Sequence, residues 1–304
     1  MPRLGFGLPV SGSWATPQNL AHFARRAEER RYDSVWSFQR LLNPADGDWG
    51  PMYRSVHDPL IALGYAAAVT ERVRLGTAIV NAPFYAPIVL AKQLTTLDVL
   101  SGGRLDVGLG LGWSREEFVA TGVPYERRGA RVEEFVACLR AVWADDPVDF
   151  AGEFYRVPPA KVDPKPVQQP SPPVLLGGAA EVALRRAGRI ADGWISASRH
   201  DLTRFGDAVA TIRAAAEEAG RDPGGLRFIV RGVVHLDEEK HDDGVHRPLT
   251  GTAEQIREDL GVLGDHGATD VFLDLNFNPR VGSPDADPAE STAYAEQVLE
   301  TFAP

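Results

Sequence analysis

The sequence predicts an α/β protein of the (β/α)8 TIM-barrel class, folded as a single domain over residues 1–304 with loop insertions. Short apolar runs alternate with segments of helical periodicity along the whole chain, and there are eight of each. This alternation indicates parallel strands, because a parallel connection needs a long return path. A length of 304 residues also suits one barrel. An open, doubly wound sheet is the alternative that the same pattern allows.

Each predicted strand is a short run in which apolar residues dominate, bounded by polar residues, Gly or Pro. Runs of this kind are typical of parallel strands that are buried on both faces. In chain order, the predicted strands are Arg3–Leu8, Ser34–Ser37, Val73–Ile79, Leu105–Leu109, Val174–Leu176, Trp194–Ala197, Arg227–Arg231 and Asp270–Leu275.

The predicted helices are marked by apolar residues at i, i+3 and i+4 and by start signals at their N-termini. Thr16-Pro17 and Asp58-Pro59 each place a capping side chain directly before a proline, which suits the first helical position. The helices are expected at residues 17–30, 58–69, 87–100, 126–143, 179–190, 203–219, 252–264 and 288–302.

Three segments exceed the short connections of a minimal barrel. Residues 38–57 form a long loop after the second predicted strand, and loops of that length in compact domains are usually lids or spacers. Residues 147–173 are expected to hold a small strand pair, at 148–150 and 154–157, followed by a proline-rich stretch. Residues 233–250 are acidic and hydrophilic, and we expect them to form a solvated surface excursion.

The overall charge limits the classes of partner. The chain has 42 acidic and 32 basic residues and a formal net charge of −10, so neither nucleic acid nor an anionic membrane surface is an expected partner. A helix N-terminus can still bind an anionic cofactor. The N-terminus predicts a strand rather than a leader, and no apolar run approaches the roughly 20 residues that span a bilayer. We therefore expect a cytoplasmic protein.

Cysteine and histidine usage argues against disulfide and metal chemistry. Cys138 is the only cysteine, which leaves no internal disulfide, and its apolar neighbours predict a small buried side chain rather than a nucleophile. The seven histidines form no HxH or HxxxH pair, so no metal site is expected. The sequence contains no GxSxG elbow and no GxxxxGKS loop, so hydrolase and nucleoside-triphosphatase functions lack support.

Glycines mark the end of the fourth predicted strand, in the run GLGLGW at residues 108–113. In a barrel of this class, functional residues lie where strands end and the following loops begin. Such glycines satisfy either tight barrel packing or a close approach of the backbone to a flat ring. Trp113 favours the ring, because a large aromatic side chain at a loop mouth is costly unless it covers something.

Gly177 and Gly178 end the fifth predicted strand and directly precede a predicted helix. Unpaired N–H groups and the helix dipole together form an anion site at such a position, and phosphate is its natural guest. A simple tight turn is the alternative. The residues by themselves therefore predict a cofactor that carries a phosphate and a flat ring.

Several stretches in order along nearly the whole chain carry a family resemblance. They include TERVRLGT (70–77), PIVLAK (87–92), LDVLSGGR (97–104), LLGG (175–178) and AGRIADGW (187–194). Together with GLGLGW, they resemble the luciferase-like monooxygenase superfamily, and within it the oxidoreductases that use the deazaflavin coenzyme F420. The resemblance implies a homodimeric barrel with F420 lying across the carboxyl-terminal mouth, and FMN is the alternative cofactor.

The resemblance also implies which residues meet the cofactor. Relatives have a bulge in the third strand, often with a non-prolyl cis peptide, that backs the ring of the cofactor. Glycines after the fourth strand border the ring or its tail, and glycines after the fifth strand hold the phosphate. The implied cofactor-binding residues are Ala78, Ile79, Asn81, Gly110, Gly112, Trp113, Gly177 and Gly178.

The chain departs from many F420-dependent relatives directly after the second predicted strand. Those relatives have an acid followed by a histidine, whereas this chain has Gln39 and Arg40. Gln39 can hydrogen-bond a ring carbonyl but is not a base, and Arg40 is a permanent cation. A histidine-based oxidation of a sugar phosphate is therefore not implied, and Arg40 suits an anionic group or a substrate that gains charge on reduction. The predicted catalytic residues are Gln39, Arg40 and Trp113.

These observations predict hydride transfer between F420 and a small organic substrate, with the protein supplying orientation and exclusion of water. Residues 38–57, with Trp49 and Tyr53, are the expected lid, and Phe277 and Asn278 are expected to complete the substrate wall. Two alternatives stand beside this hypothesis. One is an FMN-dependent monooxygenase that receives electrons from a separate flavin reductase, and the other is a barrel that binds a cofactor without catalysis.

Overall fold

Parallel strands at eight positions close into a barrel in the computed structural model, which describes residues 1–47, 49–237 and 246–304. Closure is direct, because β13 (Asp270–Asp274) pairs with β1 (Arg3–Gly7) and β3 (Arg74–Thr77) pairs with β5 (Leu105–Gly110). The remaining barrel strands are β2 (Ser34–Ser37), β8 (Val174–Gly177), β9 (Gly193–Ile195) and β10 (Arg227–Val233). The barrel prediction is confirmed, and the open-sheet alternative is wrong.

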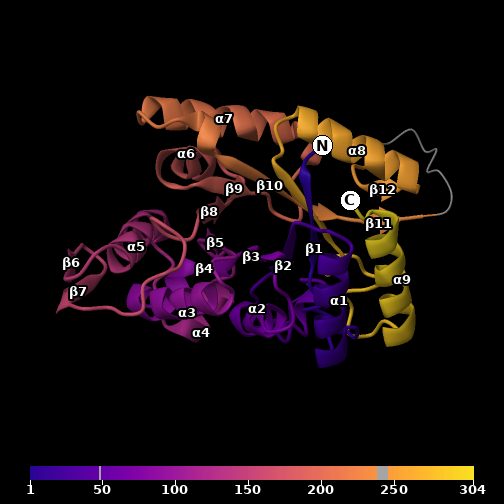
Figure 1. Cartoon of the computed structure of the whole chain (residues 1–304), viewed down its shortest axis with the longest axis horizontal. Coiled ribbons are helices and arrows are strands. Elements are labelled where there is room, and N and C mark those ends of the chain that lie inside the picture. The colour runs from indigo at the N-terminus through magenta and orange to yellow at the C-terminus, as the bar shows by residue number, and fades with distance from the viewer. Residues whose placement is uncertain (48, 238–245) are drawn as a thin grey trace.

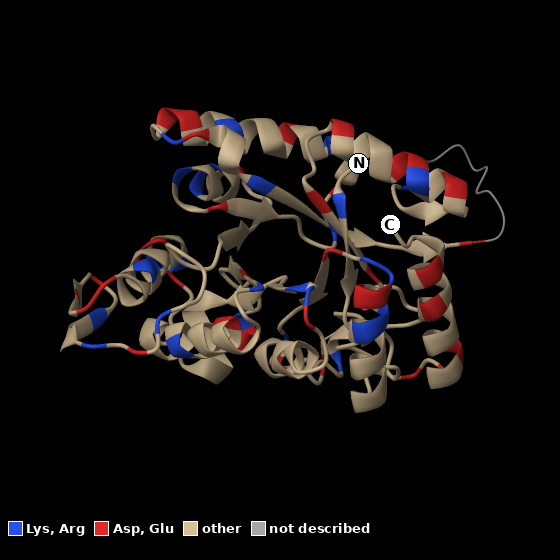
Figure 2. Cartoon of the chain, viewed as in Figure 1, with Lys and Arg blue, Asp and Glu red and all other residues tan. Residues whose placement is uncertain are grey.

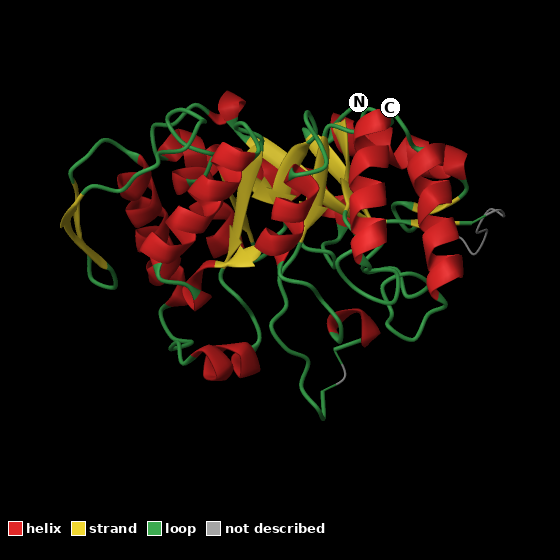
Figure 3. Cartoon of the chain, turned by 60° about the horizontal axis from the view of Figure 1, so that its bottom comes forward, coloured by secondary structure: helices red, strands yellow, loops and turns green. Residues whose placement is uncertain are grey.

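The helices surround this sheet, as Figures 1 and 3 show. Eight of them correspond to the predicted helices, and α4 was not predicted. Their bounds are α1 (Pro17–Glu29), α2 (Pro59–Ala67), α3 (Pro87–Leu100), α4 (Arg115–Thr121), α5 (Arg128–Trp143), α6 (Glu181–Ile190), α7 (Phe205–Glu218), α8 (Ala253–Asp265) and α9 (Pro288–Thr301).

Side-chain caps explain where several helices begin. The Thr16 hydroxyl accepts a hydrogen bond of 3.1 Å from the backbone N–H of Asn19 at the start of α1. The Asp58 carboxylate accepts two backbone N–H groups at the start of α2. Thr252 and Gln255 form a reciprocal capping box before α8. These caps satisfy N–H groups that have no partner within the helix, so the start signals in the sequence are physically effective.

The barrel interior is packed by large side chains. The rings of Trp36 on β2 and Phe272 on β13 stack with centroids 5.1 Å apart. Gly76 on β3 gives Trp36 its space, because a Cβ at that position would lie 2.2 Å from the indole. The interior is therefore a filled core, and open space remains only at the barrel ends.

A network of charged side chains lines the amino-terminal end of the barrel, where the strands begin. Asp106 accepts Arg74 and Arg227, each at 2.7 Å. Asp270 accepts Arg227 and Arg3, each at 3.0 Å. The carboxylates are almost fully buried and shared between guanidiniums, which compensates their desolvation. A cavity of about 550 Å³ opens at this end, but the charges that line it are paired with one another.

The third barrel strand is interrupted, contrary to its prediction as one run over Val73–Ile79. β3 ends at Thr77, and β4 (Val80–Asn81) resumes pairing with β5 after two intervening residues. The interruption shifts the chain outward at the carboxyl-terminal mouth. An apolar run cannot reveal such a break, because residues on both sides of it, such as Thr77 and Val80, remain buried.

Two insertions differ from their predictions. The strand pair in the 147–173 segment exists as β6 (Val148–Ala151) and β7 (Arg156–Ala160), so its second strand begins two residues later than predicted. This pair projects at one end of the molecule in Figure 1. The ends of the 233–250 segment are not a surface excursion, because β11 (His235–Leu236) pairs with β12 (Thr250–Gly251). Residues 238–245 of that segment lie outside the described residues.

The outer helices carry interspersed acidic and basic residues, as Figure 2 shows. Within the described ranges, no helix combines the length and the apolar character that crossing a membrane requires.

Candidate active site

A cavity of about 660 Å³ opens at the carboxyl-terminal end of the barrel. This is the end at which barrels of this class place their functional residues. The structure brings together every residue that the sequence analysis proposed as catalytic or cofactor-binding. Those lining the cavity are Gln39, Arg40, Ala78, Ile79, Asn81, Gly110, Gly112, Trp113, Gly177 and Gly178. Their separate roles in binding and catalysis remain predictions.

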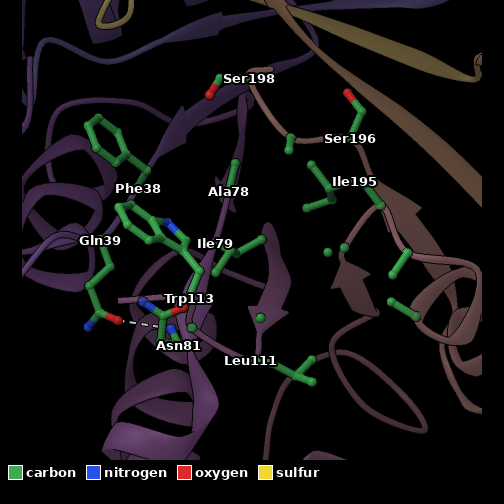
Figure 4. Close-up of a pocket in the computed structure, with 18 of the residues that line it drawn as sticks. Phe38, Gln39, Ala78, Ile79, Asn81, Leu111, Trp113, Ile195, Ser196 and Ser198 are labelled. Atoms are coloured by element: carbon green, nitrogen blue, oxygen red, sulfur yellow. Dashed lines mark hydrogen bonds between the residues drawn. The ribbon is translucent and has the colours of Figure 1, made fainter. Parts of the chain in front are cut away.

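The interrupted third strand forms one wall of the cavity. The peptide bond between Ala78 and Ile79 is cis, as the resemblance implied. Figure 4 shows these two residues between the Gln39 and Trp113 side of the cavity and the side formed by Ile195 and Ser196. The bulge therefore presents its backbone and the Ile79 side chain to any ligand that enters.

Both polar atoms of the Gln39 side chain form hydrogen bonds, and one of these bonds holds the bulge. Its Oε1 accepts the backbone N–H of Asn81 at 2.9 Å, the hydrogen bond drawn in Figure 4. Its Nε2 donates to the hydroxyl of Tyr85 at 2.6 Å. Burial raises the pKa of Tyr85 above its ordinary value, so that hydroxyl stays protonated. Gln39 thus positions Asn81, and its part in catalysis is indirect in this arrangement.

Arg231, on β10, completes the support of the bulge, and the sequence analysis missed it. Its Nη1 donates to the carbonyl oxygen of Ala78 at 2.9 Å, and its Nε donates to Asp274 at 2.6 Å. The guanidinium also lies 4.1 Å from the ring centroid of Phe277. The available signal was a charged residue near the carboxyl end of an otherwise apolar strand, with an acid at the end of the last strand.

Arg40 is enclosed by aromatic rings on the opposite side of the mouth. Its Cζ lies 4.8 Å from the ring centroid of Trp113, 5.0 Å from that of Tyr53 and 5.4 Å from that of Trp49. Nη1 lies 3.4 Å from the buried carboxylate of Glu117 on α4. Burial lowers the pKa of Arg40, and the Glu117 charge opposes that shift. The cation is retained because rings and carboxylate surround it together.

The loop of residues 38–57 thus packs onto the cavity mouth, as expected for a lid, although residue 48 lies outside the described residues. Trp49 reaches Trp113 with ring centroids 4.6 Å apart. Phe277 lines the cavity, as predicted. Asn278 does not, because its buried amide donates to the carbonyl oxygen of Val234 at 2.9 Å, so its prediction as a wall residue is wrong.

The opposite end of the cavity suits an anion. Gly177 and Gly178 lie just before α6, whose N-cap residue Ala180 offers no capping side chain. A Cβ on Gly177 would lie 3.4 Å from the nearest side-chain carbon, so protein packing does not demand glycine there. The missing side chain instead keeps the backbone bare on the cavity side. Exposed amides at a helix N-terminus bind phosphate.

Three guanidiniums flank these amides. Arg127, Arg128 and Arg186 all line the same cavity. Arg186 is held by Glu133 at 2.8 Å, and Arg128 lies over the ring of Tyr125 at 3.9 Å from its centroid. Such a group of cations exceeds what one phosphate requires, and it suits a ligand with several negative charges.

The described residues form no comparable site for a metal ion. In the described part of the chain, no group of three or more His, Cys, Asp or Glu side chains is placed to hold a metal ion. The site can therefore do chemistry through a bound organic cofactor, with polar groups that orient and charges that stabilise.

Comparisons with known proteins agree with this geometry. The sequence profile of the luciferase-like monooxygenase family matches residues 5–243. An uncharacterised protein of Mycobacterium tuberculosis is 34% identical over 269 residues, which cover 87% of this chain and 84% of that protein. The F420-dependent glucose-6-phosphate dehydrogenase of Kineococcus radiotolerans is 31% identical over 261 residues, which cover 83% of this chain and 75% of the dehydrogenase.

Solved structures share the fold. Monooxygenase RslO1 from Streptomyces bottropensis matches with a TM-score of 0.81 at 24% identity, over 99% of this chain and 98% of that one. The F420-dependent tetrahydromethanopterin reductase from Methanopyrus kandleri matches with a TM-score of 0.75 at 19% identity, with the same coverage. These likenesses establish the barrel alone, whereas the profile and the sequence relatives go further. The chain belongs to the luciferase-like monooxygenase family.

Proposed function

We propose that this protein is an oxidoreductase that binds coenzyme F420 in the cavity and transfers a hydride between it and a small organic substrate. One observation carries the proposal. Backbone without side chains at Gly177 and Gly178 lies in the same cavity lining as three arginines and an aromatic mouth. A long anionic tail and a flat ring are the two parts of F420 that such a lining suits. The relatives that carry F420 in their names support the same cofactor.

The chain's own residues fit the cofactor part by part. The bulge at Ala78 and Ile79 would back the ring, and the bare strand end at Gly110 and Gly112 would border it. The amides of Gly177 and its neighbour would hold the phosphate. When bound, the deazaflavin ring supplies a carbon that gives or takes a hydride. The protein contributes orientation and a site with little water.

The cationic end favours F420 over FMN. The F420 tail carries a phosphodiester and glutamate carboxylates, whereas FMN ends in one phosphate. Arg127, Arg128 and Arg186 line this end, where Glu153 pairs with Arg127 and Glu133 pairs with Arg186. Like the phosphate, the carboxylates of the tail suit the planar fork of a guanidinium. We therefore place FMN second. The homodimer implied by the resemblance and the cytoplasmic location expected from the sequence stay predictions.

Fluorescence titrations of the purified protein with F420 and with FMN test the proposal. F420 should bind, and Arg186→Met should weaken that binding about tenfold or more, because a charge-assisted hydrogen bond is lost. Arg189→Met is the matched control, since Arg189 pairs with the same Glu133 but does not line the cavity. It should leave the affinity unchanged. Tight binding of FMN together with no affinity for F420 would overturn the proposal.

A further inference from the structure

An aromatic wall, made of Phe38, Phe277, Tyr53 and Trp113, lines the mouth of the cavity. Successive rings along it have centroids 5.1, 5.4 and 6.3 Å apart. Trp113 is 52% exposed although it stands on the cavity rim. An exposed indole on a wall of packed rings offers a flat apolar face, and a planar ligand would cover it by offset stacking. A sugar phosphate, which needs many polar partners, fits this wall poorly.

Tyr53 is the one side chain among the described lining residues that could serve as an acid or base other than the arginines. The cavity lining, as far as the described residues define it, contains no Asp, Glu, His or Lys side chain. Oxidation of an alcohol requires a group that removes the hydroxyl proton. Reduction of a carbonyl makes a different demand, because negative charge grows on the oxygen and a nearby cation stabilises it. The lining therefore suits reduction.

Two arginines lie against the aromatic wall, and they differ in how fully they are bonded. Arg231 is occupied by Asp274 and by the Ala78 carbonyl. The Arg40 side chain is 7% exposed, and its Nε and Nη1 have no hydrogen-bond partner among the described residues. The Oε2 of Glu117, 3.4 Å from Nη1, is likewise without a hydrogen bond in that part of the chain. Buried donors of this kind are costly unless an acceptor reaches them.

We infer that the substrate is a planar conjugated carbonyl compound, that the enzyme reduces it, and that Arg40 holds its oxygen. This inference rests on the proposed function and names the substrate class and the direction of that reaction. The flat carbon skeleton stacks on the aromatic wall, beside Trp113. Arg40 lines the cavity while its Nε and Nη1 are buried in the protein, so the carbonyl oxygen lies beside the part of the guanidinium that faces the cavity.

The reduction balances without a protein base. When bound, reduced F420 would supply the hydride for a new C–H bond at the electrophilic β-carbon of the substrate, losing two electrons and releasing its second hydrogen to water as a proton. The C=C π pair shifts toward the carbonyl, and its π pair moves onto the oxygen. The resulting enolate is stabilised by the Arg40 cation and takes a proton from water. Arg40 itself neither gives nor takes a proton.

Calorimetric titration of the whole protein, with and without F420, tests the inference with three probes. Benzylideneacetone is the planar enone, 4-phenylbutan-2-ol is its saturated alcohol, and glucose 6-phosphate represents the substrate class in the names of the dehydrogenase relatives. The enone should bind about tenfold more tightly than the alcohol, because only its oxygen is held flat against a charged donor. Reduced F420 should be oxidised when the enone is added.

A pair of variants isolates Arg40. Arg40→Met alone leaves Glu117 buried and uncompensated, so the test variant is Arg40→Met with Glu117→Gln, which preserves the acceptor for the Leu41 N–H. Its circular dichroism checks folding. Its preference for the enone over the alcohol should disappear, whereas Arg204→Met, an exposed arginine outside the cavity, should keep that preference.

The outcomes separate the two proposals. If F420 binds but glucose 6-phosphate is bound and oxidised while the enone is ignored, the inference is wrong and the proposed function stands. An undiminished preference for the enone in a folded double variant also overturns the inference. If the enone binds but F420 does not, the proposed function fails, and the reduction step fails with it.

Discussion

Replacing Arg231 with methionine should destabilise the protein by about 4 kcal/mol. Arg231 and Asp274 are 8% and 1% exposed, and their Nε and Oδ2 atoms are 2.6 Å apart. Removing one member of a buried ion pair costs about 3–5 kcal/mol. The lower end, about 3, applies here because Asp274 Oδ1 keeps two hydrogen bonds from Asn276. The lost donor to the Ala78 carbonyl adds about 1 kcal/mol. Methionine retains most contacts with the neighbouring rings.

Urea unfolding, followed by tryptophan fluorescence and by circular dichroism, measures this loss, provided that the two transitions coincide. Asp274→Asn in the same chain should restore about 2 kcal/mol, because the uncompensated charge is gone. Arg3→Met is the control. Its side chain is 48% exposed, and its partner Asp270 keeps Arg227, so it should cost at most about 1 kcal/mol. A cost below about 1 kcal/mol for Arg231→Met, or no recovery in the double variant, would refute the reasoning.

Three further predictions concern other parts of the molecule. In a fluorescence titration, Gly177→Asp should weaken F420 binding far more than the isosteric Gly177→Asn. Both side chains have space, but only the aspartate repels a phosphate. Equal effects of the two variants would place the phosphate elsewhere. Burial alone would raise the pKa of Asp270, but Arg227 lowers this pKa below its ordinary value. The ionised carboxylate therefore adds stability at pH values above its ordinary pKa, and this contribution is lost as the pH falls through the lower pKa of the folded state. Asp270→Asn should accordingly flatten the acid limb of a stability-against-pH curve below about pH 4, and an unchanged limb would contradict this. Burial raises the pKa of Cys138 to about 11, so its thiol should react with a disulfide reagent only when urea unfolds the chain; rapid labelling of the native protein would show that the thiol is accessible.

Local pattern was sufficient for most of the fold. Proline after a capping residue at Thr16 and Asp58 predicted helix starts that the hydrogen bonds reproduce. The 233–250 segment was misjudged, because its polar centre outweighed buried residues such as Val234 and Leu249 at its ends. Helix α4 was missed because it is short, and its buried Glu117 faces a cation rather than solvent. Hydrophobic periodicity identifies the apolar face of a helix. It cannot show that a charged residue is buried against a partner from a distant part of the chain.

The sequence by itself predicted the barrel class, because strand ends and helix starts are marked locally, and its family resemblance implied the cavity glycines and several residues of the mouth. Only the tertiary structure decided which of those side chains have hydrogen-bond partners within the protein. Arg231 meets the Ala78 carbonyl across 153 positions of the chain, and Arg40 meets Glu117 from a helix that was not predicted. Contacts of this range depend on closure of the barrel, which brings distant strands together at one end. The difference between a hydrogen-bonded Arg231 and an Arg40 whose Nε and Nη1 have no hydrogen-bond partner in the described part of the chain is therefore a property of the closed barrel.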